Sequence, residues 1–183
     1  MKFALTLIAY PIAVVAASAS KATQSRLDGP FTASILSPSI INAAVNASDG
    51  KFYINKPTKT YCPGNVVDCS EFDGSNTVFI MSYDSRLGLE NIVAGVYIAQ
   101  DGSLSFTQAH SAAIPPESTV TGFSREQGIK PNESYLRIAD REWVICPVSH
   151  GPPEKRTYQI FAYVYSLGNC FNAEIKTYDS DPS

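Results

Sequence analysis

Hydrophobic and polar residues alternate one by one along several short stretches of this chain. The alternating runs lie at 31–36, 51–55, 77–82, 95–99, 103–107, 141–146 and 157–165. Successive side chains of a β-strand point to opposite faces, so a period of two predicts strands with one buried face. No window of 12 residues places its apolar residues at the spacing of a helix. The pattern therefore predicts an all-β chain.

Two Asp-Gly pairs interrupt this alternation at places that suit tight turns. Asp49-Gly50 and Asp101-Gly102 each stand between two short alternating segments. The favoured two-residue hairpin turn needs a positive φ at both central residues, and Asp followed by Gly adopts it readily. We therefore expect a β-hairpin at each pair.

Three segments that surround such turns resemble one another, at 46–55, 98–107 and 137–146. Each has Asp at its fourth place and a large apolar residue at its seventh and ninth places. Three such units predict a β-trefoil-like barrel, in which three hairpin units close a barrel of six strands. An antiparallel β-sandwich or another antiparallel barrel is the alternative, because any all-β chain contains several Asp turns. The repeated positions, aspartates first and expected core residues after them, are Asp49, Asp101, Asp140, Phe52, Leu104, Trp143, Ile54, Phe106 and Ile145.

The first residues have the layout of a secretory signal peptide. Lys2 precedes an apolar stretch, and small residues follow at 16–19. The stretch is shorter than a bilayer span and contains Pro11, which disfavours a membrane anchor. We therefore expect an exported chain without membrane contact once the signal is removed. Its expected parts are the signal peptide at 1–19, a flexible lead at 20–30, a single all-β domain at 31–178 and a tail at 179–183.

Composition and charge remove several classes of function. Of the 183 residues, 44% are hydrophobic and 17% are charged, which favours a folded chain over a disordered one. The net charge is −3 and the lysines and arginines are scattered, so no basic stripe is present to bind nucleic acid. No phosphate loop, dinucleotide fingerprint or calcium loop occurs, and no cysteines or histidines have the spacing of metal ligands. We expect no cofactor and no metal.

Four cysteines are present, and an exported chain meets an oxidising compartment that favours disulfides. Four cysteines allow three pairings. We favour Cys62–Cys69 with Cys146–Cys170, because each pair joins near neighbours and encloses a segment rich in turn residues. Two Asn-x-Ser sequons, at Asn46 and Asn132, predict glycans on the surface of an exported protein.

Candidates for catalysis are few. The chain has two histidines, His110 just after a predicted strand and His150 in a loop rich in glycine and proline. A hydrolase would need a nucleophile and a buried carboxylate near His110, and no Gly-x-Ser-x-Gly motif is present. The recurring aspartates are explained by turns, where the Asp side chain bonds the backbone two residues on. We expect a protein that is not an enzyme.

Aromatic side chains offer a different kind of site. Exposed tyrosines can stack on sugar rings, and Tyr53, Tyr61 and Tyr97 are the candidates for contact with carbohydrate. Trp143 occupies one of the repeated apolar positions, so we expect it in the core instead.

Several short motifs occur in one order along most of the chain. They are TYCP at 60–63, GSLSFTQAHS at 102–111 with IPP at 114–116, CP at 146–147 and QIFA at 159–162. Together, over about residues 50–170, they resemble the fungal cell wall protein PhiA family, whose members are phialide-development wall proteins and IgE-binding allergens. The resemblance implies a secreted glycoprotein of the wall of asexual spore-bearing structures, and it supplies no catalytic residues. It also matches Cys62 with Cys69 and Cys146 with Cys170. Family members have Gly where this chain has Glu117.

The sequence thus favours a secreted, non-enzymatic structural protein of the cell wall, involved in phialide or conidium development and in contact with wall polysaccharide. The alternatives are a secreted lectin-like carbohydrate-binding module and a host-directed effector. A hydrolase that uses His110 ranks last.

Overall fold

The computed structural model describes residues 27, 29–38, 40–59, 76–90, 92–130, 132–163 and 168–180. These residues form 13 strands and one short turn of 3-10 helix, η2 (Pro153–Lys155). The strands are β1 (Phe31–Ser37), β2 (Ile40–Ala44), β3 (Asn46–Ser48), β4 (Lys51–Ile54), β5 (Phe79–Met81), β6 (Leu87–Leu89), β7 (Ala94–Ile98), β8 (Leu104–Phe106), β9 (Phe123–Gln127), β10 (Ser134–Ile138), β11 (Glu142–Pro147), β12 (Tyr158–Tyr163) and β13 (Phe171–Asp179).

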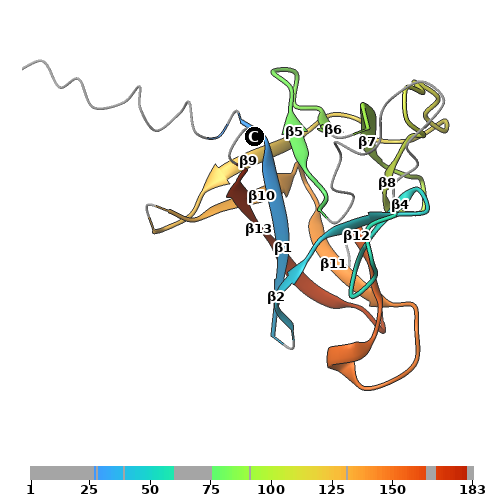
Figure 1. The fold of residues 1–183 in the computed structure, drawn as a ribbon, viewed down its shortest axis with the longest axis vertical. Coiled ribbons are helices and arrows are strands. Elements are labelled where there is room, and N and C mark those ends of the chain that lie inside the picture. Colours follow the sequence, from blue (N-terminus) through green and yellow to red (C-terminus); the bar gives the residue numbers. More distant parts are fainter. Residues whose placement is uncertain are drawn as a thin grey trace, which may run out of the picture.

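The strands close into an antiparallel barrel (Figure 1). Among the described residues the ring runs β1, β5, β6, β7, β8, β4, β12, β11, β13 and back to β1, which makes nine strands. The closing pair is β1 with β13, in register from Phe31 opposite Asp179 to Leu36 opposite Glu174. Four strands lie outside the ring: β2 pairs with β1, β3 with β4, β10 with β13, and β9 with β10. Closure leaves the ring strands without free edges and gives the chain one enclosed core.

The prediction of a single all-β domain with a barrel is confirmed, and all seven alternating runs contain strands. A nine-stranded ring is larger than the six-stranded barrel of a trefoil. The three aligned hairpins also close differently: Ser48 pairs with Lys51, Ile98 pairs with Leu104, and Ile138 makes an isolated bridge. The resemblance among the three segments therefore reflects shared turn and core chemistry, while the strands that flank each turn find different partners.

Both Asp-Gly pairs lie in hairpin connections, and the first forms the expected two-residue turn. Asp49 and Gly50 have φ values of 51° and 78°, as a two-residue hairpin turn requires. At the second pair only Gly102 is left-handed, with φ 81°, and a five-residue connection, 99–103, joins β7 to β8. Asp140 turns the third segment with φ 57°.

The repeated apolar positions all lie in the core. Trp143 is 2% exposed and its indole nitrogen donates to the carbonyl of Leu136 over 2.7 Å, which confirms its structural role. A line of four phenylalanine rings crosses the core, with neighbouring centroids 5.3–5.5 Å apart: Phe31, Phe79, Phe52 and Phe106. These rings join the first strand to two of the predicted hairpins.

The predicted disulfide between Cys146 and Cys170 is present, with 4.3 Å between the Cα atoms. It joins β11 to the start of β13 and encloses β12 and η2. The other predicted pair, Cys62–Cys69, lies outside the described residues.

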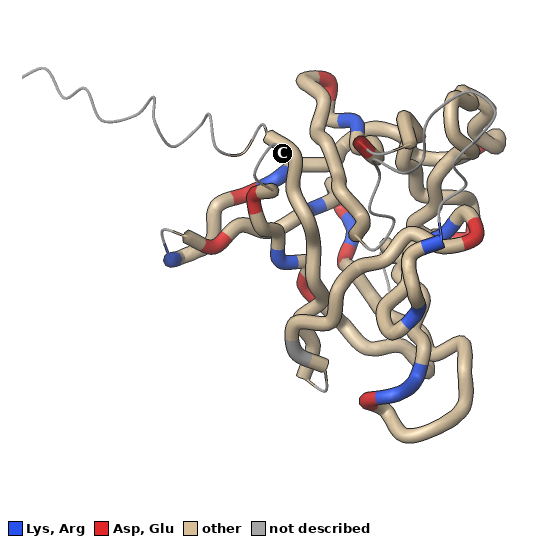
Figure 2. The backbone as a smooth tube through the Cα atoms, viewed as in Figure 1, with Lys and Arg blue, Asp and Glu red and all other residues tan. Residues whose placement is uncertain are grey.

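Charged residues of both signs are interspersed along the backbone (Figure 2), in keeping with the absence of a basic stripe from the sequence. No helix in the described part of the chain is long and apolar enough to cross a bilayer.

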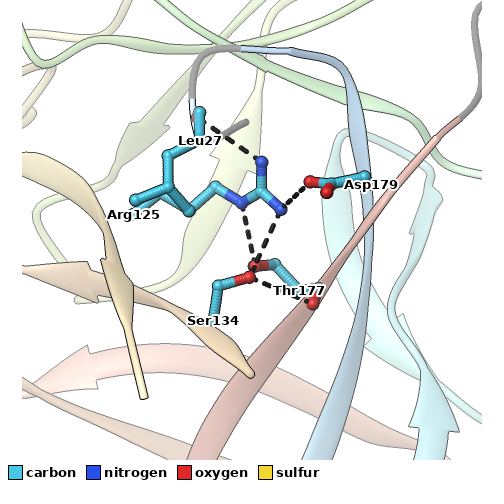
Figure 3. Close-up of polar contacts among 5 residues, drawn as sticks. All are labelled: Leu27, Arg125, Ser134, Thr177 and Asp179. Carbon is cyan, nitrogen blue, oxygen red and sulfur yellow. Dashed lines mark hydrogen bonds and ion pairs between the residues drawn. The ribbon is translucent and has the colours of Figure 1, made fainter. Parts of the chain in front are cut away.

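A buried arginine ties the closing strands together (Figure 3). Arg125 on β9 donates to Thr177 Oγ1 at 2.9 Å, Ser134 Oγ at 3.3 Å and the Leu27 carbonyl at 3.4 Å, and it pairs with Asp179 at 2.5 Å. Its side chain is 2% exposed. The cluster connects β9, β10 and β13 with the segment that leads into β1. Strand β13 ends at Asp179, the first residue of the segment predicted as a tail.

Candidate functional site

An open groove of about 760 Å³ lies where the two Asp-Gly hairpins meet. Three parts of the chain contribute to its lining: the turn between β3 and β4, the hairpin of β7 and β8, here called the floor, and the loop at 115–117, here called the rim. Strands β4 and β8 are neighbours in the ring, and this pairing brings the two turns together. The groove is lined by Asp49, Gly50, Lys51, Tyr97, Ala99, Gln100, Asp101, Ser103, Ser105, Phe106, Pro115, Pro116 and Glu117.

The floor carries a chain of buried hydroxyl groups that ends on a carboxylate. Ser105 Oγ lies 3.1 Å from Ser103 Oγ, which donates to Asp101 Oδ1 over 2.6 Å. The same carboxylate oxygen accepts from the backbone N–H of Ser103, two residues on, at 2.9 Å. This is the predicted turn role of Asp101, and it fixes the carboxylate at the edge of the groove.

Two ionisable groups of the floor have pKa values that are shifted further away from neutral pH. Burial would raise the pKa of Asp101, but the hydrogen bonds from Ser103 and the charge of Lys51 outweigh it and lower that pKa below its ordinary value. Burial, and after it the charge of Asp101, raises the pKa of Tyr97. At neutral pH the groove therefore presents an ionised carboxylate beside a protonated phenol.

The loop rim is anchored to β7 by backbone hydrogen bonds. Ile98 and Thr119 exchange two of them, at 2.9 and 2.8 Å. Glu117 has a φ of 61°, a left-handed conformation that glycine adopts without strain. Its carboxylate accepts a hydrogen bond from the side chain of Gln100, which also lines the groove. Glu117 thus keeps a backbone shape that glycine adopts most readily, and it adds an acceptor.

Two of the three carboxylates that line the groove, those of Asp49 and Asp101, have lysine neighbours. Lys51 lies 3.7 Å from Asp101, and Asp49 contacts Lys56 at 3.0 Å and Lys59 at 3.6 Å. The hydrogen bond and charge of Lys56 lower the pKa of Asp49. Glu117, the third carboxylate of the lining, accepts from the Gln100 amide instead.

The tyrosine candidates fall in different places. Tyr97 lines the groove, half-buried on β7. Tyr53 on β4 is not among the lining residues, and Lys56 Nζ covers its ring at 4.0 Å from the centroid. Tyr61 lies outside the described residues.

The two sequons differ in their surroundings. Asn132 is exposed in the connection between β9 and β10. Asn46 is half-buried on β3, where its amide donates to the Lys56 carbonyl at 2.8 Å and its side-chain oxygen accepts from Thr58 at 3.3 Å. Glycosylation of either asparagine stays a prediction.

Both histidines are exposed and lie away from the groove lining. His110 has a φ of 56° at a turn, where its backbone N–H donates to the Val93 carbonyl at 3.3 Å. Within the described ranges, no group of three or more His, Cys, Asp or Glu side chains could hold a metal ion.

Sequence reasoning missed Gln100, Ser105 and Glu117 as residues of one site. The two Asp-Gly turns were the available signal, because both border the groove. What the sequence lacked was the neighbour relation of β4 and β8, which is a long-range pairing.

We expect Gly102→Ala to destabilise the groove floor. Gly102 has a φ of 81°, and a Cβ there would lie 2.7 Å from Tyr163 Cζ, whose hydroxyl donates to the Asp101 carbonyl. Backbone strain and displacement of that ring should lower the free energy of unfolding by about 1–2 kcal/mol in urea denaturation. Gly95→Ala is the matched control, because nothing lies within 4 Å of a Cβ at that position. Equal stability of the two variants would contradict the strained turn.

We expect Asp101 to contribute to acid sensitivity. Its folded pKa lies below the unfolded value of about 3.9, so its contribution to stability is full above that pH and is lost as pH falls through the lowered pKa. Asp101→Asn should therefore flatten the loss of unfolding free energy below about pH 4. Urea denaturation at several acidic pH values measures the slope, and an unchanged slope would contradict the assignment.

Comparison with known proteins gives one informative similarity. The chain is 33% identical over 122 residues to an uncharacterized secreted protein of the fungus Arthroderma benhamiae. The match covers 66% of this chain and 60% of that protein. No family model matches the chain, and no solved structure matches it.

Proposed function

We propose that the protein is a secreted, non-enzymatic structural protein of the fungal cell wall that is retained by non-covalent contact with polysaccharide. The signal-like N-terminus, the similarity to a secreted fungal protein and the resemblance to the PhiA family support export into the wall. A closed barrel with a disulfide supports durability in an oxidising compartment. Through the same resemblance we propose a role in phialide or conidium development.

The observation that carries a binding role is the chemistry of the groove. Its carboxylates are engaged in turns and ion pairs, and the lowered pKa values of Asp49 and Asp101 keep both ionised at neutral pH. A general acid or base works best with a pKa near the operating pH. The groove therefore supports binding of a polar ligand better than proton transfer.

Fractionation of fungal cultures tests this proposal. A tagged protein should appear in the wall fraction, resist washing with salt and be released when the polysaccharide is digested by glucanase or chitinase. Protein found in the medium alone, with none in the wall, would contradict the proposal. That outcome together with glycan binding would favour the lectin-like or host-directed alternative, which the position of Tyr97 in the groove supports.

A further inference from the structure

We infer that the groove between the two Asp-Gly hairpins binds an uncharged, hydroxyl-rich polysaccharide, with one sugar face against Tyr97. The inference rests on the proposed function, because this contact would be the one that retains the protein in the wall. Three properties of the groove lead to it: the balance of charge, the direction of the hydrogen bonds and the apolar surface beside them.

Charge balance argues against an ionic ligand. The lining contains three carboxylates, of Asp49, Asp101 and Glu117, and one lysine, Lys51, so a sulfated or phosphorylated polymer would meet net negative charge there. Lys51 already neighbours Asp101, and Lys56 and Lys59 already neighbour Asp49. A polycation would therefore have to displace lysines that are in place. A neutral ligand is not repelled by the carboxylates and does not have to displace a lysine.

The hydrogen bonds of the floor leave acceptors facing the groove. The Ser103 hydroxyl donates its hydrogen bond to Asp101. Ser105, which is 3% exposed, can donate to the Ser103 carbonyl at 3.3 Å. Oxygen lone pairs of the exposed carboxylates of Asp101 and Glu117 remain for a ligand that supplies hydrogen-bond donors. Sugar hydroxyl groups are such donors. Lys51 adds a donor for a ring or glycosidic oxygen.

Apolar surface stands beside these acceptors. Tyr97 is held on β7 opposite Ser105, and Pro115 and Pro116 border the same groove. In the described part of the chain, no aromatic ring or cation covers the Tyr97 ring, in contrast to Tyr53 under Lys56. The C–H face of a pyranose can pack on the part of the Tyr97 ring that lines the groove while its hydroxyls reach the floor.

Glu117 supplies a further acceptor beside the groove. Its φ of 61° is left-handed, a conformation that costs a non-glycine residue free energy and that a glycine would adopt without strain. Its carboxylate accepts from Gln100, which also lines the groove, and its lone pairs can accept from a sugar hydroxyl. The volume of about 760 Å³ also lies within the range of ligand sites and suits a short run of sugar rings.

Pull-down with insoluble polysaccharides tests the inference. Neutral β-1,3-glucan and chitin serve as probes, with chitosan as a polycation and immobilised dextran sulfate as a polyanion. The protein should bind at least one neutral probe, with affinities at about 50 and 500 mM NaCl that agree within about twofold. Retention by charged probes alone, abolished by salt, would overturn the inference, and so would retention by none.

Variants locate the contact. Tyr97→Ala should weaken binding about tenfold or more, while Tyr97→Phe should keep most of it because the ring remains. Glu117→Gly should weaken binding several-fold with an unchanged or raised melting temperature, since it removes the strain together with the side chain. Tyr53→Ala is the control on β4 and should bind as the wild type. If Tyr97→Ala fails to fold, the Glu117→Gly result decides: full binding by that folded variant overturns the inference.

The same variants separate this inference from the proposed function. If wild-type protein resides in the wall and folded Tyr97→Ala and Glu117→Gly stay there equally, the wall role stands and the groove assignment fails. If the protein is absent from the wall but binds a neutral glycan through Tyr97, the groove assignment stands and the wall role fails.

Discussion

Replacing Arg125 by Ala should lower the free energy of unfolding by about 3–4 kcal/mol. The variant loses every hydrogen bond that the guanidinium makes to Ser134, Thr177 and Asp179. It also loses packing on the Phe31 ring, whose centroid lies 4.6 Å from the guanidinium carbon, and it leaves a cavity. Urea denaturation followed by tryptophan fluorescence measures the change.

Arg137→Ala is the matched control. Arg137 also pairs with an acid on β13, Glu174 at 3.1 Å, but the two side chains are 37% and 50% exposed. Solvent screens such a pair, so the control should change the stability by no more than about 0.5 kcal/mol. Equal stability of the two arginine variants would contradict the prediction that Arg125 stabilises the contact of β9 and β10 with β13.

Removing the disulfide with Cys146→Ala and Cys170→Ala together should lower the free energy of unfolding by about 3.5 kcal/mol. The bridge spans a sequence separation of 24 residues, and without it the unfolded chain regains the freedom of that loop. The double substitution leaves Cys62 and Cys69 untouched, which reduction of the whole protein would not do. A loss below about 1 kcal/mol would mean that the bridge adds little to a barrel already closed by strand pairing.

Alternation predicted the strands whose two faces differ strongly. It missed β13, where the buried Ala173, Ile175 and Thr177 do alternate with Glu174 and Lys176, because exposed aromatic residues, Phe171 and Tyr178, stand near the two ends and interrupt the pattern. Yet β13 pairs with β1, β10 and β11 and closes the ring. The number of ring strands depended on this strand, and the sequence therefore indicated a barrel without fixing its size.

The site could be predicted only in part for a related reason. Local turn chemistry was enough to place Asp49 and Asp101 in hairpins, because each turn involves neighbours in the sequence. Tyr97 was recognised as an aromatic candidate, but its position depends on the pairing of β7 with β8 and of β8 with β4. Glu117 and Arg125 gave no local signal, since their partners lie 17 and 54 residues away.

Titration of the ¹⁵N-labelled protein with soluble neutral oligosaccharides, a β-1,3-linked glucose hexamer and a chitin hexamer, tests the central claim most directly. We predict that at least one of them shifts backbone amides at 49–51, 97–106 and 117, while the amides of β2, β9 and β10 stay in place. The absence of any shift at millimolar oligosaccharide, or shifts confined to parts of the barrel remote from the two hairpin turns, would contradict it.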